Sequence, residues 1–505
     1  MKLSKTNFLI CLDCAKNAWL KIHKPEVYKK KALSSFELNI IDTGNQIDEL
    51  ARDLFPGGVL VESRDDTELT KKLMKEKTSV IYQPVFATET YLAVSDIFVF
   101  NPDTNIYDLY EVKSSTASEE NGGRKTEDYL IDIAFQKIVL DNLDIKVGTL
   151  NLIRLNKNYV HLGDINLEEL FFIEDLTSQV NEKLEDVRNK MEGAFELLSS
   201  ETEPRGHCDC IVKGRNSHCT TSWYSNSDLP EYSVHAIARI HKTKLAELVD
   251  SHIFNIHDVP DDFPLSDNQK RQVETAKSGK EYIDKNGISE FLGTMKYPLA
   301  FLDYETYPSA IPRYNKYSPY QQIPFQFSLH VIESPDSESI HYDFIYSDNE
   351  CPDESFAEAL KKHLPEKGSV IVWNQKFEQG INKQLGERLS EYKDFMQNVN
   401  NRVIDLMIPF SGSTTMYDHP KFKGSASIKY VLPALVPHLS YKDMHIQEGG
   451  TASDTWNRIM SGEYSEEEKN IKIQALKDYC HLDTLAMVEI WKVLNASISQ
   501  TEIKK

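Results

Sequence analysis

The stretch from Thr78 to Asn156 constrains the fold most, because its hydrophobic pattern changes from strand-like to helical and back. Three strand-like runs come first: "TSVIYQPVFAT", "TYLAVSDIFVF" and "YDLYEVKSS". A segment with helical periodicity, "TEDYLIDIAFQKIVLDNL", then precedes a fourth strand-like run, "VGTLNLIRLN". Three strands, a helix and another strand predict an α/β core.

A second α/β pattern occupies the C-terminal part of the chain. It begins at "FLDYETYP", continues through "PFQFSLHVIES" and "SVIVWNQ", and ends in the helix "EEKNIKIQALKDYCHLDTLAMVEIWKVL". Because 505 residues are too many for one hydrophobic core, we expect two domains joined by a connector. The boundaries that we predict are 1–225 for the first domain, 226–294 for a helical connector, 295–495 for the second domain and 496–505 for a tail.

The charge of the chain limits the kinds of partner. A formal net charge of −21 argues against a broad, non-specific coat for nucleic acid, but acidic metal sites of a nuclease would add to such a charge. No run approaches the roughly 20 apolar residues that cross a bilayer, so we expect a cytoplasmic protein with no membrane partner. A local basic patch, or simply a solvated surface, is indicated near the N-terminus by Lys2, Lys5, Lys16, Lys21, Lys24, Lys29, Lys30 and Lys31.

Two neighbouring strand-like runs carry the first group of candidate catalytic residues. We expect Asp96 inside the run "VSDIFVF", and Glu111 and Lys113 two residues apart in "YDLYEVKSS". Side chains at i and i+2 project from the same face of a strand, so Glu111 and Lys113 are expected side by side. Two carboxylates that hold Mg²⁺, with a lysine that orients water, suit metal-dependent phosphodiester cleavage. The alternative is charged alternation on a half-exposed strand.

The next helix adds Gln136 to this group. An Asp, a Glu-x-Lys and a helical Gln in this order resemble the RecB-like branch of the PD-(D/E)XK nucleases. The resemblance implies a restriction-endonuclease-like core with Asp96 and Glu111 as metal ligands and Lys113 and Gln136 at the active site. Glu49, on an early helix, is a candidate for the additional acid that this branch often uses, with a surface glutamate as the alternative.

Five of the seven cysteines gather in two clusters far apart in the sequence, which is not the pattern of a secreted disulfide framework. They resemble the cysteines of four-cysteine RecB-like nucleases, in which an Fe4S4 (4Fe-4S) cluster joins the two ends of the domain. Thiolates bind iron strongly, and such a clamp closes a very long loop. Zn²⁺ is an alternative to the cluster. The ligands that the resemblance implies are Cys14, Cys208, Cys210 and Cys219, and possible substitutes are Cys11, His207 and His218.

Three pairs of residues form the second group of candidates. Asp303 and Glu305 share one face of a strand. Asn374 and Glu378 lie four residues apart where a strand leads into a helix. Tyr479 and Asp483 share one face of a helix. These motifs resemble those of the DEDD exonucleases of the DnaQ-like superfamily, which has the RNase H fold. Tyr479, in the last motif, resembles the tyrosine that defines the tyrosine subtype of these exonucleases.

That resemblance implies a site in which four carboxylates hold two divalent ions, Mg²⁺ or Mn²⁺, while Tyr479 orients the attacking water. The ligands would be Asp303, Glu305, Glu378 and Asp483. Glu378 departs from the pattern because the superfamily usually has aspartate there, so activity or metal preference could differ. Asp405 is a second candidate acid, although a structural strand-end aspartate is the favoured interpretation.

Tyrosines and basic residues alternate between the first two motifs, in "YETYPSAIPRYNKYSPYQQIPFQF". Aromatic and basic side chains beside a nuclease site suit stacking and charge neutralisation of a single strand. A loop packed on its own domain is the equally weighted alternative. The residues concerned are Tyr307, Arg313, Tyr314, Lys316, Tyr317 and Tyr320.

The order of "FLDYET", "PFQFSLH" and "YCHLDTLAMV" closely resembles a bacterial family catalogued as domain-of-unknown-function family 2779. Its members join a RecB-like nuclease domain to a DnaQ-like domain, and "GSASIKYVLPAL" resembles a helix before the last motif to which we assign no chemistry. The resemblance implies an α/β protein with a restriction-endonuclease-like core, a helical connector and an RNase H-like mixed-sheet domain.

The function that this combination implies is a metal-dependent nuclease with two active sites, for which DNA is favoured over RNA as the substrate. The first domain would cut DNA, and the second would trim single strands from 3′ to 5′, in DNA processing, repair or defence. A nucleic-acid-binding or assembly subunit with degenerate nuclease sites is the alternative. Glu378 and the acidic net charge point to that alternative.

Overall fold

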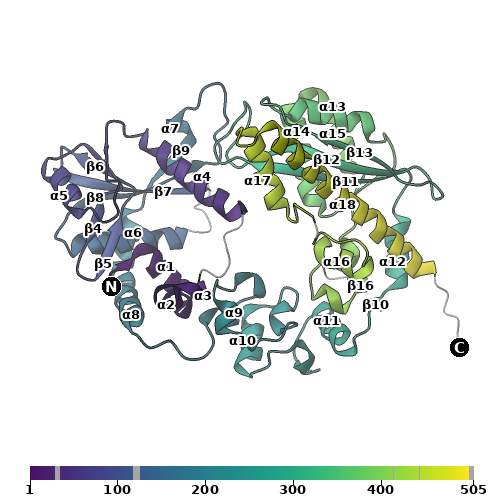
Figure 1. The fold of residues 1–505 in the computed structure, drawn as a ribbon, viewed down its shortest axis with the longest axis horizontal. Helices are drawn as coiled ribbons and strands as arrows, with labels where there is room; N and C mark the ends of the chain where they lie inside the picture. Colours follow the sequence, from purple (N-terminus) through teal and green to yellow (C-terminus); the bar gives the residue numbers. More distant parts are fainter. Residues whose placement is uncertain (29–34, 118–125, 413–414, 443, 500–505) are drawn as a thin grey trace. The chain divides into compact units, whose positions relative to one another are not determined.

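The computed structural model describes the chain except for residues 29–34, 118–125, 413–414, 443 and 500–505. The protein consists of two compact units, both mixed α/β (Figure 1). None of the described helices combines the length and the apolar composition needed to span a membrane. Unit 1 comprises Met1–Ile211, Ser217–Ser227 and Ser309–Gln321, and unit 2 comprises Val212–Asn216, Asp228–Pro308 and Gln322–Lys505.

A six-stranded mixed sheet with the order β2-β3-β6-β7-β8-β9 forms the centre of unit 1. β7, its longest strand, pairs antiparallel with β6 and parallel with β8. A smaller sheet has the order β1-β5-β4. The strands are β1 (Leu3–Ser4), β2 (Val59–Leu60), β3 (Val80–Tyr82), β4 (Val85–Ala87), β5 (Tyr91–Val94), β6 (Ile97–Asn101), β7 (Ile106–Ala117), β8 (Val147–Asn156) and β9 (Phe171–Asp175).

Helices cover both faces of the larger sheet of unit 1. Leu109 of β7 belongs to a core that includes Phe135 and Val187, whereas Val112 packs in a second core with Ile47. This alternation follows from the period of two along a strand. The helices of unit 1 are α1 (Lys5–Asp13), α2 (Ala15–His23), α3 (Pro25–Tyr28), α4 (Ser35–Arg52), α5 (Thr67–Lys75), α6 (Thr126–Asp141), α7 (Leu167–Leu170), α8 (Thr177–Ser199) and α9 (Ser222–Ser225).

Two of the predicted strands are interrupted. The runs "TSVIYQPVFAT" and "TYLAVSDIFVF" each form two short strands that belong to different sheets. Gln83, with a φ of 51°, and Pro84 turn the chain between β3 and β4, since proline offers no N–H to a sheet. The prediction that Asp96 lies inside a strand was wrong, because the residue occupies the break between β5 and β6. There its Oδ2 accepts a hydrogen bond from the Val112 N–H at 2.7 Å.

Unit 2 contains a five-stranded sheet with the order β13-β12-β11-β14-β15. β11 pairs antiparallel with β12 and parallel with β14, so it is the central strand. β10 and β16 form a separate antiparallel pair. The strands are β10 (Tyr282–Ile283), β11 (Leu299–Pro308), β12 (Gln322–Ile332), β13 (Ile340–Ile345), β14 (Ser369–Val372), β15 (Val403–Asp405) and β16 (Tyr417–Asp418).

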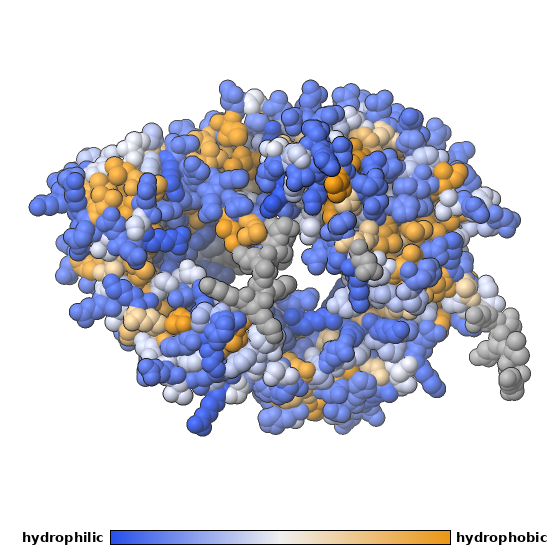
Figure 2. Space-filling model, in the orientation of Figure 1, coloured by the Kyte–Doolittle hydropathy of each residue, from blue (hydrophilic) through white to orange (hydrophobic). Residues whose placement is uncertain are grey.

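The two faces of this sheet pack against different helices. Leu302 and Tyr304 share a core with Phe356 of α13 and Leu385 of α14, whereas Phe301 faces Trp491 of α18 at a ring-centroid distance of 6.0 Å. The helices of unit 2 are α10 (Lys242–Asp250), α11 (Asp267–Ser278), α12 (Lys285–Gly293), α13 (Asp353–His363), α14 (Gln375–Arg388), α15 (Lys393–Asn401), α16 (Ile428–Leu435), α17 (Gly449–Met460) and α18 (Glu466–Ser499). On the face drawn in Figure 2, hydrophilic residues dominate, and hydrophobic ones occur in separate groups.

Two predicted boundary segments have defined structure. Most of the expected connector, 226–294, belongs to unit 2, where its strand β10 pairs with β16. The expected tail, 496–505, begins inside α18, and residues 500–505 lie outside the described part of the chain.

The tyrosine-rich loop between β11 and β12 belongs to unit 1 from Ser309 to Gln321. Tyr317 is 1% exposed, and its carbonyl accepts a hydrogen bond from the His161 N–H at 2.9 Å. The Tyr320 hydroxyl donates to the Ser114 carbonyl at 2.7 Å. These contacts favour a packed loop over an exposed platform for stacking bases.

Candidate functional site

The first group of candidates meets beside the central strand of unit 1. Glu111 and Lys113 lie together, as their spacing on β7 predicts, with Lys113 Nζ 2.5 Å from Glu111 Oε1. Gln136 of α6 donates from Nε2 to Glu111 Oε2 at 2.7 Å. Asp96 joins them through its bond to the backbone of Val112. The four predicted residues are therefore neighbours.

Two further residues complete this group, and the sequence analysis did not place either of them there. Lys5, the first residue of α1, lies 2.8 Å from Glu111 Oε1 and 3.0 Å from Asp132 Oδ1. Asp132 also accepts from Lys113 at 2.6 Å. Asp132 precedes Gln136 by four residues, a spacing that puts both on one face of α6 and could have identified it. Lys5 is distant in sequence, so no spacing rule finds it.

The pKa values of the two predicted acids in this group, Glu111 and Asp96, shift in opposite directions. Burial by itself raises the pKa of Glu111, but the charges of Lys113 and Lys5 outweigh that effect and lower the pKa overall. Burial, with a contribution from the Glu111 charge, raises the pKa of Asp96 to about 8. Near neutral pH, Glu111 is therefore a carboxylate, while Asp96 without a bound cation retains a proton.

The additional acid near this group is Asp48, not Glu49. Glu49 is exposed on α4, whereas the charge of Asp48 contributes to the raised pKa of Asp96. One oxygen of Asp48 accepts from Arg52 at 2.5 Å and from Gln83 at 3.2 Å. Its other oxygen is buried and has no hydrogen-bond partner within the described ranges. Neighbouring residues on a helix point about 100° apart. This rotation explains why Asp48 faces the group and Glu49 does not.

The expected basic patch is partly used for internal contacts. Lys16 donates to the Gly206 carbonyl at 2.6 Å, and Lys24 pairs with Glu203 at 2.6 Å. Lys5 belongs to the acidic group above. The remaining predicted members include Lys29, Lys30 and Lys31, which lie outside the described residues. The contacts of Lys5, Lys16 and Lys24 argue against a continuous phosphate track.

The second group of candidates lines one pocket of unit 2, with a volume of about 190 Å³. β11, α14 and α18 contribute its acidic side chains. Trp373 and Phe377 also line the pocket, and Phe377 is 36% exposed. The five predicted residues in the lining are Asp303, Glu305, Glu378, Tyr479 and Asp483.

Local structure at the start of α14 fixes the position of Glu378. Asn374 adopts the left-handed conformation, with φ 86° and ψ 70°, which asparagine tolerates better than most residues. The Asp405 carboxylate accepts from the N–H groups of Asn374 and Gln375 at 3.1 and 3.2 Å, and from that of Met407 at 3.0 Å. Asp405 thus anchors the backbone at this turn, which is the structural interpretation favoured from the sequence.

Burial and mutual repulsion raise the pKa values of the pocket acids. Burial, followed by the Asp483 charge, raises those of Asp303 and Glu305. Burial raises the pKa of Glu378 to about 8 and that of Asp483 to about 6. Glu378 Oε2 is buried without a hydrogen-bond partner in the described structure. Carboxylates that line one pocket, one of them with an oxygen that has no partner, are donors that suit hard divalent cations.

Two residues near the pocket acids were missed from the sequence. The Tyr441 hydroxyl donates to Asp483 Oδ1 at 2.6 Å, and its ring lies 6.0 Å from that of Tyr479. Lys429 of α16 is half-buried, and its charge opposes the raised pKa values of Glu305 and Asp483. Lys429 lies in "GSASIKYVLPAL", to which we assigned no chemistry. Neither residue has a diagnostic spacing to the motifs.

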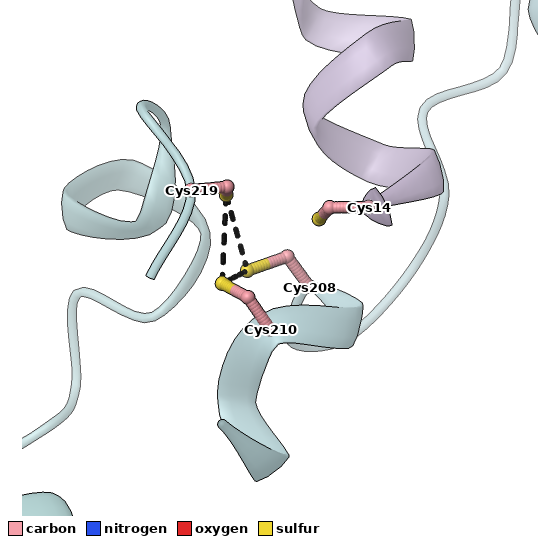
Figure 3. A group of neighbouring side chains, drawn as sticks. All are labelled: Cys14, Cys208, Cys210 and Cys219. Atoms are coloured by element: carbon pink, nitrogen blue, oxygen red, sulfur yellow. Dashed lines mark hydrogen bonds between the residues drawn. The ribbon is translucent and has the colours of Figure 1, made fainter. Parts of the chain in front are cut away.

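The four predicted cysteines converge in unit 1, and their Sγ atoms all lie within 4.8 Å of one another (Figure 3). Cys208 Sγ lies 2.9 Å from Cys210 Sγ and 3.8 Å from Cys219 Sγ. Cys14, at the N-cap of α2, completes the group, and hydrogen bonding with Cys208 lowers its pKa to about 6. This four-cysteine group could hold a metal. The alternatives Cys11, His207 and His218 are not members of it.

The close spacing of Cys208 and Cys210 follows from a 3₁₀ turn at Asp209–Val212. The Ile211 N–H donates to the Cys208 carbonyl at 3.0 Å. Asp209 Oδ2 accepts from the Ala15 N–H at 2.6 Å, which ties the turn to the start of α2. Segments almost 200 residues apart are thereby joined at the cysteines.

Comparison with known proteins gives two partial similarities and no activity. Residues 300–427 match the family described as "Domain of unknown function (DUF2779)". The chain is also similar to the "Uncharacterized protein MG366 homolog" of Mycoplasma pneumoniae (strain ATCC 29342 / M129 / Subtype 1), with 26% identity over 232 residues. That match covers 42% of this chain and 35% of the relative, so the chain matches about a third of the relative's length. The family match includes Asp303, Glu305 and Glu378, and ends before Tyr479.

If the cysteine group holds a metal, we predict that Cys208→Ser and Cys210→Ser remove it, because each substitution deletes a thiolate ligand and leaves three. Elemental analysis for iron and zinc, together with visible absorption, measures the loss and identifies the metal. Cys351→Ser is the matched control, since this half-buried cysteine lies in unit 2 outside the group. Equal metal content in wild type and both variants would contradict a metal site at these cysteines.

We also predict that the metal-free protein loses stability as the pH rises. Burial raises the pKa of Glu378 from 4.5 to about 8, so between these values the native state binds a proton that the unfolded chain has released. The free energy of unfolding then falls by up to about 1.4 kcal/mol per pH unit. Urea unfolding of chelator-treated protein at several pH values measures this slope. Glu378→Gln should flatten it, and an unchanged slope in that variant would refute the assignment to Glu378.

Proposed function

We propose that the protein is a metal-dependent nuclease with two active sites, acting on DNA in the cytoplasm. Unit 1 would be a RecB-like nuclease with a restriction-endonuclease-like core, and unit 2 a DnaQ-like exonuclease with an RNase H-like sheet. One observation carries the proposal: Asp303, Glu305, Glu378 and Asp483 converge with Tyr479 in one pocket of unit 2. In the described structure none of these carboxylates forms an ion pair with a lysine or arginine.

The pocket residues fit Mg²⁺ or Mn²⁺, because the donors are carboxylate oxygens and one of them, Glu378 Oε2, is buried without a partner. Bound divalent ions would supply an activated water and stabilise the leaving oxygen. Tyr479 would orient that water through its hydroxyl. Tyr441 holds Asp483 by a hydrogen bond to Oδ1, which fixes the direction of the remaining oxygen. Glu378, despite its longer side chain, still belongs to the pocket lining.

Aromatic side chains beside the acids suit a single-stranded substrate. Trp373 and Phe377 line the same pocket, and the Trp373 Nε1–H donates to the Ala426 carbonyl at 3.1 Å, which fixes its ring. An exposed ring next to a hydrolytic site can stack on a base of any sequence. The half-buried Lys429 would contribute the cation that partly neutralises a phosphate beside Glu305 and Asp483.

In unit 1 the proposed cleavage depends on Glu111 and Lys113, with Asp96 and Gln136 around them. Lys113 would stabilise the negative charge that develops on the phosphate. For the cysteine group we propose a 4Fe-4S cluster or a single Zn²⁺. The short Sγ distances favour zinc, since four thiolates about 2.3 Å from one tetrahedral ion lie roughly 3.8 Å apart.

One observation favours the second candidate function, an assembly or nucleic-acid-binding subunit, for unit 1. Lys5 and Lys113 both contact Glu111 Oε1, and Gln136 occupies Glu111 Oε2. These contacts already satisfy the carboxylate that would have to accept a cation. Unit 1 would then bind DNA without cutting it, while unit 2 retains hydrolysis.

We predict that Asp303→Asn and Asp483→Asn each lower exonuclease activity at least about 100-fold, because each removes charge where the transition state needs it. The assay follows degradation of end-labelled single- and double-stranded DNA and RNA with Mg²⁺ or Mn²⁺. Glu333→Gln, which changes an exposed acid of unit 2, is the control. Lys113→Ala should leave this activity unchanged and abolish any cutting by unit 1. If the variant carrying both aspartate substitutions trims as fast as wild type, the proposed site is wrong.

We predict that Phe377→Ala raises the KM for single-stranded DNA about 10-fold and changes kcat little, because stacking on one base contributes about 1–3 kcal/mol to binding. Steady-state kinetics on short labelled strands separate the two constants. Ile471→Ala is the control, since this exposed apolar residue of α18 lies outside the pocket lining. A loss of kcat at unchanged KM would exclude a stacking role for Phe377.

A further inference from the structure

Three histidines from three different elements meet on the face of the unit 2 sheet that α18 covers. They are His330 of β12, His341 of β13 and His481 of α18, and one ring nitrogen of each lies within 4.8 Å of the others. Their ring centroids are 4.5, 5.0 and 4.3 Å apart. His330 and His341 are direct partners in the β12–β13 register. The sheet and the helix therefore fix this histidine group from three directions.

Hydroxyl groups hold two of the three rings through their second nitrogen. His330 Nδ1 hydrogen-bonds to Thr484 Oγ1 at 2.8 Å, and His341 Nε2 hydrogen-bonds to Ser328 Oγ at 2.9 Å. The two hydroxyls are themselves 2.6 Å apart. His330 Nε2 and His341 Nδ1 thus remain as candidate ligand atoms. Histidines that bind metals are usually oriented in this way by a hydrogen bond at the other ring nitrogen.

The group also has the chemistry of a site for a transition metal. Three imidazoles without a carboxylate suit zinc and its neighbours rather than Mg²⁺ or Ca²⁺. Ring nitrogens bound to one tetrahedral zinc at about 2.0–2.1 Å lie roughly 3.3 Å apart. The side chains of His341 and His481 are half-buried, so their rings can turn toward that separation when a metal binds. His330 is buried, and burial lowers its pKa to about 3, so its ring is neutral as a ligand must be.

The histidine group is separate from the acidic pocket. None of its members is in the pocket lining, and His481 precedes Asp483 by two residues, which on a helix places the two side chains on different sides. We propose that His330, His341 and His481 bind one Zn²⁺, which would join α18 to β12 and β13 and leave a fourth coordination position for water or an added ligand. This proposal goes beyond the proposed nuclease function and does not depend on it.

The test measures zinc bound by the full-length protein. After chelator treatment, the protein is dialysed against Zn²⁺ in small molar excess over the cysteine and histidine groups together, with a large excess of Mg²⁺ to occupy the acidic pocket. Bound zinc is then determined by elemental analysis. We expect wild type to hold one zinc per chain more than His341→Ala or His481→Ala. The control His438→Ala, an exposed histidine of unit 2, should match wild type. Equal zinc in wild type and both variants would overturn the proposal.

Two further measurements cover the case that these variants do not fold. Ser328→Ala removes the hydrogen bond that orients His341 and should weaken zinc binding about 10–100-fold. In wild-type protein, zinc should protect His341 and His481 from modification by diethyl pyrocarbonate, while His438 reacts equally with and without zinc; mass spectrometry of the peptides reports each residue. If zinc protects neither His341 nor His481, the proposal is wrong.

Discussion

The burial of several carboxylates beside a central strand is the constraint on which both units depend. A buried carboxylate is stable only if a cation, a proton or several hydrogen bonds compensate its charge. Unit 1 meets this requirement internally, because Lys5 and Lys113 both contact Glu111. The pocket acids of unit 2 have no such pair in the described structure, and the pKa values of Asp303, Glu305 and Glu378 are raised instead. The charge of buried carboxylates is therefore compensated by lysines at the unit 1 site and by retained protons at the unit 2 pocket.

This difference bears on which unit is the stronger candidate for catalysis. A divalent cation that enters the unit 2 pocket replaces protons on acids whose pKa values are raised. It also provides a partner for Glu378 Oε2, which has none in the described structure. A cation that approaches Glu111 in unit 1 must instead compete with two ammonium groups already within hydrogen-bond distance. Cation binding thus relieves repulsion in unit 2, but would have to displace existing contacts in unit 1. On this physical ground the hydrolytic proposal is stronger for unit 2.

The sequence predicted the parts of both sites that follow from local geometry. Glu111 and Lys113 lie together because strand residues two apart share a face, and Tyr479 and Asp483 line one pocket because helical residues four apart do. Lys5, Lys429 and Tyr441 could not be predicted in this way, since each reaches its partners through tertiary packing. Asp96 was misplaced because a turn at Ser95 and Asp96 interrupts a continuous hydrophobic run. The choice of Glu49 over Asp48 failed because a single-residue shift on a helix redirects the side chain.

The long helix α18 links these findings, because its polar residues serve different purposes on different sides. Tyr479 and Asp483 face the acidic pocket, Thr484 bonds to Ser328 and His330 of β12, and Gln326 Nε2 of β12 donates to the Leu476 carbonyl at 2.9 Å. The hydrogen bonds to β12 fix the rotation and the height of the helix on the sheet. Asp483 can meet Asp303 only if that placement is held, since the two come from elements joined by no local turn. A polar contact outside the pocket lining, such as Thr484 with His330, therefore helps to determine the distance between the acids across the pocket.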